Sequence, residues 1–306
     1  MREVNIFTTL FFVAYFLNVR NIYIRMKLLA IDLDGTLFYP KGKKRCISKK
    51  NVKFLQDFVD AGNKIVLCTS RSEAFVKRLE NEIQRPFDYL ACTTAKIVSA
   101  TDGVIRDIPA NNDDMADVLK FLDEKHRPAA YLMTTDKYPV LIKQNIPMSK
   151  LFLWIYHTYW KLQFCYREKY LIDNQLFDEA LKSGNIYKMM VFYGFGRSKK
   201  EISKELNKIV RERHPNIESS WSLIVNELTP KGCNKGEGLE YYCNHYNIDP
   251  NDVYVIGDSG NDISMFNKYH EHSFVMSHAY PSVKKYAKTV VRRVFKLRQF
   301  VLEGEK

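Results

Sequence analysis

Several features that would place the chain in a specialised class are missing from its sequence. Glycine and proline are sparse, with 13 and 10 among 306 residues, and no stretch is collagen-like, proline-rich or low in complexity. We find no internal repeat, which excludes a solenoid or a propeller. With 46% hydrophobic and 27% charged residues, the composition is that of a globular protein that can bury a sizeable core and form two lobes.

Cysteines with the spacing of a metal or redox motif are also absent. The six cysteines form no C-x-x-C pair, and Cys68 and Cys92 lie in apolar, strand-like runs. We therefore expect reduced, structural thiols and a cytoplasmic protein.

Acidic residues are in the minority, because 47 Lys and Arg outnumber 35 Asp and Glu and give a net charge of +12. Such a charge favours anionic partners, such as phosphorylated metabolites, nucleic acid or anionic lipid. The basic residues gather in short runs near positions 41–45, 197–200 and 292–298. Since no nucleic-acid-binding signature accompanies these runs, we expect solvated helix faces and loops, and no nucleic-acid partner.

An uninterrupted apolar segment of membrane-spanning length is missing too. Residues 6–17 are mostly apolar, but Asn18, Arg20 and Asn21 interrupt the continuation to Ile24. We expect residues 1–25 to be an apolar extension outside the fold. The alternative is a membrane anchor formed by residues 4–24, without which no membrane partner is expected.

What the sequence does contain is an alternation of short apolar runs and amphipathic segments. The runs 27–33, 64–68 and 87–92 predict buried strands, and Ser48 and Ser72 can cap the helices between them. Further along, residues 235–246, 253–256 and 262–268 predict helix, strand and helix. This alternation predicts an α/β fold with a Rossmann-like parallel sheet.

A long stretch separates these two α/β segments. We expect residues 95–228 to form an inserted α+β cap domain, with a strand at 187–193 and a charged helix at 199–213. The core domain would then comprise residues 26–94 and 229–306. Because ligands bind at the carboxyl ends of the strands in open α/β sheets, such an insert would cover the site.

The most informative motif is D-L-D-G-T-L at residues 32–37, directly behind the first predicted strand. In an extended strand Asp32 and Asp34 point to the same side. Two carboxylates there can share a hard cation, one attacking a substrate and the other exchanging a proton with the leaving group. Gly35 allows a sharp turn after the acids. A bare D-x-D-G is often only an Asx turn, but its place behind a buried strand favours a functional site.

Three weaker elements follow in order. Thr69 ends the second predicted strand, where its hydroxyl could hold phosphate oxygens. Lys235 begins a helix, against the helix dipole, which bound phosphate and carboxylates would explain. The run Gly257–Asp262 (GDSGND) places two acids and an amide beyond a buried strand, as is typical of a Mg²⁺ site.

In this order the elements resemble those of the haloacid dehalogenase superfamily, and within it the Cof-type hydrolases of subfamily IIB, which carry an inserted α/β cap. The resemblance covers roughly residues 26 to 291. It implies that Asp32 is the nucleophile that forms an aspartyl-phosphate and that Asp34 is the general acid and base. The implied phosphate-binding residues are Thr69, Ser70, Lys235 and Asn261, with Lys235 also catalytic. The implied Mg²⁺ site consists of Asp32, Asp34 through its backbone carbonyl, Asp258 and, from just behind, Asp262.

The implied function is that of a Mg²⁺-dependent phosphatase acting on small phosphomonoesters, such as a sugar phosphate, a nucleotide or a cofactor phosphate. Two alternatives stay open: a phosphomutase of the phosphomannomutase-like type, and a non-catalytic binding module on the same fold. The sequence names neither the substrate nor the oligomeric state.

Two departures from the family pattern lie beside the expected site. Ser70 stands where relatives carry the glycine of T-G-R, and Thr94-Ala95 stands where they tend to carry Asn-Gly. Losing both glycines changes the backbone conformations that are open there. We expect an effect on substrate choice rather than on catalysis.

Aromatic residues are dense between positions 151 and 170, in numbers that exceed what one face of a helix buries. A helix wedged between the two domains is one explanation. The other is that rings such as Trp154, Tyr159 and Trp160 contact an apolar or planar leaving group.

We predict that a chain beginning at Met26 folds and works as well as the full chain, because the first strand is expected from Lys27 and no chemical motif precedes it. The measurement compares soluble yield and phosphate release for the two proteins. An insoluble or inactive short chain would contradict the prediction, and recovery of the full chain with membranes would favour the anchor.

Overall fold

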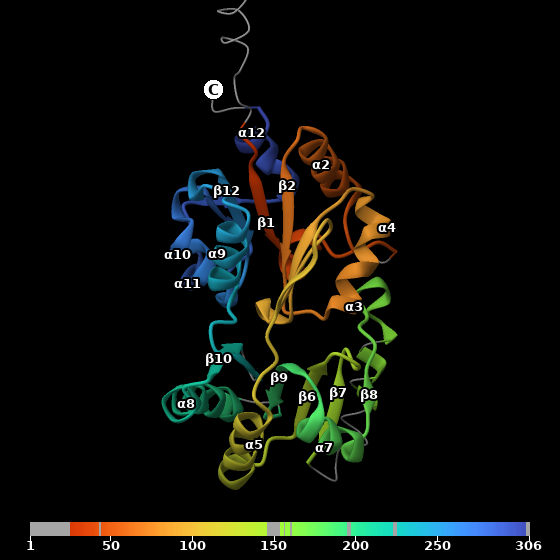
Figure 1. The fold of residues 1–306 in the computed structure, drawn as a ribbon, viewed down its shortest axis with the longest axis vertical. Coiled ribbons are helices and arrows are strands. Elements are labelled where there is room, and N and C mark those ends of the chain that lie inside the picture. The colour runs from red at the N-terminus through yellow and green to blue at the C-terminus, as the bar shows by residue number, and fades with distance from the viewer. Residues whose placement is uncertain are drawn as a thin grey trace, which may run out of the picture.

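The chain forms two β-sheets in the computed structural model. The model describes residues 25–42, 44–145, 154–155, 157–159, 161–194, 197–222 and 225–303. The larger sheet has eight strands in the order β14-β13-β12-β1-β2-β3-β4-β5, and the smaller has six in the order β10-β11-β9-β6-β7-β8. Figure 1 shows the smaller sheet below the larger one. In the described part of the chain, no helix is long and apolar enough to cross a membrane.

The first sheet confirms the predicted parallel α/β core. Its strands are β1 (Leu28–Asp32), β2 (Lys64–Cys68), β3 (Asp88–Ala91), β4 (Lys96–Ser99), β5 (Gly103–Asp107), β12 (Val253–Gly257), β13 (Ser273–Met276) and β14 (Thr289–Val291). Neighbours from β14 to β3 are parallel, whereas β4 and β5 run antiparallel to the strands beside them.

Alternate residues of β1 enter two separate cores, as a strand covered on both faces requires. Leu29 and Ile31 pack on the side of α2 (Lys49–Asp60), α3 (Glu73–Val76), α4 (Glu80–Ile83) and α12 (Arg298–Val301). Leu28 and Ala30 pack on the side of α9 (Lys235–His245), α10 (Ile263–Lys268) and α11 (Pro281–Lys284). Figure 1 shows α2 and α4 on one side of the sheet and α9, α10 and α11 on the other. Burial on both faces explains why the run Leu28–Ile31 is apolar without alternation.

The helix caps predicted in this core are also present. The Ser48 hydroxyl accepts a hydrogen bond from the Asn51 amide at 3.3 Å, and the Ser72 hydroxyl accepts one from the Phe75 amide at 3.4 Å. The two caps fix where α2 and α3 begin.

In the described part of the chain, three helices pack together against one face of the second sheet. Its strands are β6 (Ala130–Thr135), β7 (Leu141–Gln144), β8 (Leu171–Ile172), β9 (Ile186–Phe192), β10 (Ile217–Ser222) and β11 (Val225–Pro230), and its helices are α5 (Asn112–His126), α7 (Asn174–Ser183) and α8 (Arg197–Arg213). The core under these helices takes Met189 from β9 and Leu228 from β11. Because side chains alternate along a strand, Lys188 and Glu227 lie on the opposite face, which is turned to the first sheet.

The chain enters the second sheet later than expected. We expected the insert to begin at residue 95, but β4 and β5 lie beyond that position and are hydrogen-bonded to the first sheet. Two tyrosines of α9 and the tyrosine that caps it hold this hairpin. Tyr241 donates to the Ile105 carbonyl at 3.1 Å, Tyr242 donates to Asp88 at the edge of β3, and the cap residue Tyr246 donates to Asp102 at 2.6 Å. A division into a core of residues 26–107 and 231–303 and a cap of residues 108–230 is therefore a better proposal.

The two crossings between core and cap are tied together by one side chain. The Arg106 guanidinium, at the end of β5, donates to the Gly232 carbonyl at 3.2 Å and lies 3.7 Å from the Cys233 sulfur. The outgoing and returning strands of the chain therefore meet at one place.

The hydrogen bond between Tyr242 and Asp88 yields a stability prediction. Both side chains are buried, and the other oxygen of Asp88 accepts from the Ala100 amide at 2.7 Å. Tyr242→Phe should lower the free energy of unfolding by about 1–3 kcal/mol, because it leaves a buried carboxylate oxygen without its donor. Urea denaturation measures the change.

Tyr241→Phe is the matched control for that measurement, since Tyr241 is 41% exposed and water can replace its hydroxyl. We expect this variant to lose less than about 1 kcal/mol. Equal losses in the two variants would show that the buried pair does not hold the hairpin.

Candidate active site

Three carboxylates meet at the carboxyl end of the first sheet. Asp32 ends β1, and Asp258 follows its parallel neighbour β12. Together with Asp262 they offer oxygen atoms that all lie within 4.8 Å of one another. In the described ranges this is the one group of three or more acidic, histidine or cysteine side chains that could hold a metal ion. The sequence motifs at residues 32–37 and 257–262 thus converge as expected.

Lys235 lies fully buried beside this group. Its ammonium donates to Asp32 Oδ1 and to Asp262 Oδ1, each at 2.6 Å. Burial by itself lowers the pKa of Lys235, but the charges of Asp262 and Asp32 outweigh that effect and raise the pKa above its usual value. Lys235 is therefore a fixed positive charge at neutral pH.

Two of the carboxylates have raised pKa values although Lys235 lies close to them. Burial raises the pKa of Asp32 well above its usual value even though Lys235 opposes the rise. Burial also raises the pKa of Asp258, and the nearby charge of Asp262 adds to it. The group holds more negative charge than one ammonium cancels.

A divalent cation fits this surplus. Asp32 Oδ2 is buried and has no hydrogen-bond partner, so the protein does not use all the acceptor sites of the Asp32 carboxylate. Asp258 Oδ1 accepts a hydrogen bond from the Thr36 hydroxyl at 3.1 Å, and Asp258 Oδ2 lies 3.7 Å from Nε2 of His278. Carboxylate oxygens are the ligands that Mg²⁺ prefers. Asp32 and Asp258 are accordingly the side chains best suited to hold it.

Asp262 is already engaged by the protein. Its Oδ1 binds Lys235, and its Oδ2 accepts from the backbone amides of Asp258 and Ser259, both at 2.9 Å. It therefore fixes Lys235 and the loop that carries Asp258, which agrees with a place just behind the ligands. That it also belongs to a metal site stays a prediction.

Asp34 does not join the three carboxylates with its side chain. Arg71 holds both of its oxygens, through Nε to Oδ2 and Nη2 to Oδ1, each at 2.6 Å. The same guanidinium donates to the Tyr166 carbonyl at 2.8 Å and stacks 4.0 Å from the centre of the Phe75 ring. We missed this role of Arg71, although it stands in the Thr69-Ser70-Arg71 run. The expected ligation by the Asp34 backbone carbonyl stays a prediction.

The expected phosphate-binding residues line the same end of the sheet. Thr69 is buried, with its hydroxyl accepting from the Arg71 amide at 3.1 Å. Asn261 Oδ1 accepts from the Ser259 hydroxyl at 2.7 Å. The Ser70 carbonyl accepts from the ammonium of Lys188, which reaches down from β9. Lys188 is a further residue that sequence reasoning missed, since nothing along the chain links it to residue 70.

The two positions at which this chain lacks the glycine of its relatives, Ser70 and Ala95, lie in backbone of different conformation. Ser70 does not have a positive φ, so its turn does not require glycine. Cys92, Thr93 and Thr94 form three successive left-handed residues, with φ of 50°, 54° and 74°, whereas Ala95 has φ of −62°. Backbone strain is thus located at residues 92–94 and not at Ala95, where we had expected a lost glycine to matter.

Three of the cavities among the described residues lie between residues of the core and residues of the cap near this end of the sheet. One of about 490 Å³ is lined by Lys235, Asn261 and residues of α8, β10 and β11. One of about 290 Å³ is lined by Asp34, Arg71 and Tyr159, beside the aromatic stretch. Phe152, Tyr156 and Trp160 of that stretch lie outside the described residues, and Trp154 is 65% exposed.

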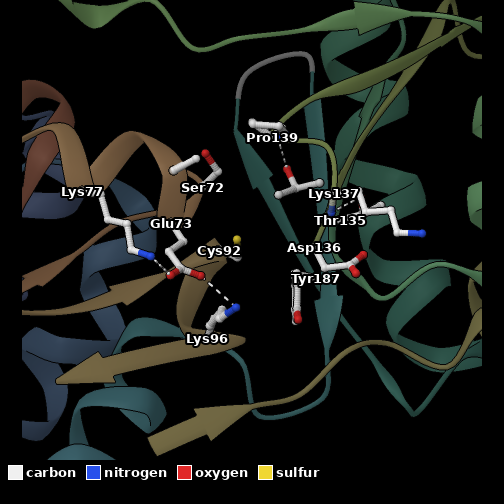
Figure 2. A pocket seen from close by; sticks show the side chains of 12 residues that line it. Ser72, Glu73, Lys77, Cys92, Lys96, Thr135, Asp136, Lys137, Pro139 and Tyr187 are labelled. Atoms are coloured by element: carbon white, nitrogen blue, oxygen red, sulfur yellow. Dashed lines mark hydrogen bonds and ion pairs between the residues drawn. The ribbon is translucent and has the colours of Figure 1, made fainter. Parts of the chain in front are cut away.

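The third cavity, of about 270 Å³, lies at the β3 side of the sheets. Figure 2 shows Glu73, Lys77 and Lys96 on its core side and Lys137 and Tyr187 on its cap side. Lys77 and Lys96 both bind Glu73, at 2.7 and 2.8 Å. The carboxylates of the site are not among the residues that line this cavity.

Comparisons with known proteins agree with this geometry. Residues 29–294 match the family model described as haloacid dehalogenase-like hydrolase. The chain is 27% identical over 280 residues to the 5-amino-6-(5-phospho-D-ribitylamino)uracil phosphatase YwtE of Bacillus subtilis. The alignment covers 85% of this chain and 91% of the relative.

Two solved structures resemble the fold closely. A haloacid dehalogenase-like hydrolase from B. subtilis has a TM-score of 0.73 at 21% identity and covers 90% of this chain and 100% of that one. A sugar phosphatase of haloacid dehalogenase subclass IIB has a TM-score of 0.69 at 21% identity and covers 90% of this chain and 98% of that one. The expected core with an inserted cap is confirmed.

A substitution at Gly35 tests whether Asp258 binds Mg²⁺. Gly35 has φ of +89°, and a Cβ there would lie 2.3 Å from Asp258 Oδ2. Gly35→Ala should therefore cost about 1–2 kcal/mol through the backbone and displace Asp258 in addition. We expect the variant to lose the rise in melting temperature that Mg²⁺ gives the wild type.

Gly62→Ala is the matched control, because Gly62 has φ of +85° but nothing lies within 4 Å of a Cβ there. It should lose similar stability without magnesium and keep the stabilisation by Mg²⁺. If Gly35→Ala keeps that stabilisation too, Asp258 is not a ligand.

Proposed function

Because the chain belongs to the haloacid dehalogenase-like hydrolases, we propose that it is a Mg²⁺-dependent phosphatase that hydrolyses small phosphomonoesters through an aspartyl-phosphate. The observation that carries the proposal is the state of Asp32. One oxygen is held by Lys235 at 2.6 Å, and the other is buried without a partner. A carboxylate fixed in this way presents one oxygen for attack. The phosphatase named among the relatives supports the same reaction class.

In the first step Asp32 attacks the phosphorus atom. A bond forms between a carboxylate oxygen and phosphorus, and the bond from phosphorus to the leaving oxygen breaks. The ammonium of Lys235 lies beside Asp32 and cancels part of the negative charge that the transferring group spreads over its oxygens. Thr69 and Asn261 are proposed to hold those oxygens from the neighbouring turns.

In the second step water attacks the phosphorus atom of the aspartyl-phosphate. Phosphate leaves, and the carboxylate of Asp32 is restored. Dividing hydrolysis in this way replaces one difficult displacement by two easier ones.

Asp34 is proposed to give a proton to the leaving oxygen and later to take one from the attacking water. Both of its oxygens bind Arg71, but each carboxylate oxygen has a second lone pair for the substrate. Arg71 therefore orients Asp34 and, through the Tyr166 carbonyl, ties that orientation to the cap. We propose Arg71 as a positioning residue on this ground.

The cation has a specific place in this scheme. Asp32 and Asp258 would hold Mg²⁺, with the Asp34 carbonyl as the remaining ligand from the chain, and Asp262 would brace Asp258 through the amide bonds described above. When bound, Mg²⁺ offsets the repulsion between the carboxylates and a phosphate dianion.

A phosphomutase is the alternative that the same residues allow. It would pass the phosphoryl group from Asp32 to a sugar hydroxyl instead of water. A requirement for a bisphosphate activator, with phosphate recovered on a second sugar position, would favour that alternative over hydrolysis.

Asp32→Asn is the test of the mechanism. The neutral amide is a poor nucleophile, so Mg²⁺-dependent phosphate release should fall by at least about a thousandfold. Mass spectrometry of acid-quenched enzyme should find an added phosphoryl group in the wild type and none in the variant.

Asp60→Asn is the control for that test, since Asp60 is half exposed and pairs with Arg85 away from the site. It should keep full activity. Wild-type activity in Asp32→Asn, with its fold shown intact by circular dichroism, would end the proposal.

A further inference from the structure

An ion pair on the cap contacts two turns of the core beside the site. Lys188 of β9 and Glu227 of β11 have their charged atoms 3.9 Å apart, and their side chains are only 9% and 15% exposed. The Lys188 ammonium donates to the Ser70 carbonyl, and Glu227 Oε1 accepts from the Thr93 hydroxyl. The pair therefore touches both core turns, at residues 69–71 and 92–94, that face the second sheet.

Glu227 also lines the cavity of about 490 Å³ that reaches Lys235 and Asn261. This cavity is the space beside the phosphate site, so a substrate whose phosphate lies between Thr69 and Lys235 would place its leaving group under the second sheet. There the leaving group would meet Glu227, which lines the cavity, while Lys188 lies behind Glu227 and is held by the Ser70 carbonyl.

The cavity wall combines a second ion pair with neutral polar groups. Arg211 of α8 lies 3.9 Å from Glu218 of β10. Between the charged residues the wall presents amides and hydroxyls, from Thr93, Asn207, Ser219, Ser220 and Thr229. Lys188 and Arg211 of the cap thus each have a carboxylate oxygen 3.9 Å away.

Such a wall discriminates by charge. A leaving group with its own carboxylate or phosphate would be placed against Glu227 and Glu218, and neither Lys188 nor Arg211 is free of a carboxylate to compensate. Hydroxyl groups both donate and accept, so they can bind an ammonium, a carboxylate and an amide at once. An uncharged chain with several hydroxyls matches all of these partners.

A planar leaving group matches this wall poorly. No aromatic side chain is among the described residues that line the cavity of about 490 Å³. The described rings Tyr159 and Tyr166 line the separate cavity beside Asp34. Of these two cavities, only the smaller one could therefore provide the aromatic contacts with the leaving group that the sequence suggested.

We infer that the substrate is a phosphomonoester of an uncharged polyol, and that Glu227, held by Lys188, selects its hydroxyls and rejects a second anion. The inference rests on the proposed phosphatase function and narrows it to one chemical class of leaving group. Glu227 acts on substrate choice, whereas Asp32 and Lys235 act on the phosphoryl group.

The test compares kcat/KM for three compounds of similar size. Glycerol 3-phosphate has an uncharged leaving group with two hydroxyls, 3-phosphoglycerate replaces one CH₂OH by a carboxylate, and phenyl phosphate is planar. The wild type should prefer glycerol 3-phosphate to each of the others by about tenfold or more.

Glu227→Gln keeps the shape and the acceptor for Thr93 but removes the negative charge. It should lower the preference for glycerol 3-phosphate over 3-phosphoglycerate by about tenfold. Glu212→Gln is the matched control, since it makes the same change at a largely exposed position of α8, where Glu212 lies 3.9 Å from Lys208. It should keep the wild-type ratio.

Three outcomes would overturn the inference. A wild-type preference for 3-phosphoglycerate or phenyl phosphate, or an unchanged ratio in Glu227→Gln, removes it while phosphate release leaves the proposed function standing. Failure of the wild type to release phosphate from any of these compounds or from acetyl phosphate removes the proposed function as well. If Glu227→Gln does not fold, the wild-type ranking of the three compounds decides.

Discussion

The buried ammonium of Lys235 is the interaction on which the site depends. A lone buried lysine tends to lose its proton and a lone buried carboxylate tends to gain one, because burial penalises the charged form. The Lys235 ammonium lies 2.6 Å from both Asp32 and Asp262, and the charges of these two carboxylates outweigh the effect of burial and raise the pKa of Lys235. These residues come from β1, from the first turn of α9 and from the loop after β12. The electrostatic balance of the site therefore fixes the relative positions of three elements that are distant in sequence.

The overall charge of the protein and the charges at the site carry different information. A net charge of +12 attracts anions to the whole surface and does not distinguish one phosphomonoester from another. Discrimination requires charges at short range in a place from which water is excluded. Lys188 and Glu227 are largely buried, and their charges sum to zero. A basic protein can thus present an electrically neutral wall to its substrate.

Sequence patterns predicted the core well because the core is built from local rules. Apolar runs gave β1 and β2, serine caps gave the starts of α2 and α3, and the acidic motifs behind buried strands gave Asp32 and Asp258. The limit of the cap was misplaced since strands β4 and β5 belong to the first sheet through pairing with β3, which no local signal reveals. Arg71 could have been found, as an arginine two residues after a strand-ending threonine can reach a carboxylate on the neighbouring strand. Lys188 and Glu227 could not, because their importance arises only from the docking of one sheet on the other.

The contact of Arg106 with Gly232 and Cys233 determines how the cap can move over this site. Two separate tethers would let the second sheet slide sideways across the strand ends. Because the tethers are joined at one guanidinium, we expect any motion of the cap to be a rotation about that place rather than a sideways shift. Such a rotation would return Lys188 to the Ser70 carbonyl and Glu227 to the Thr93 hydroxyl. A substrate is then compared with the same wall in every cycle, without any need for the cap to find its place anew.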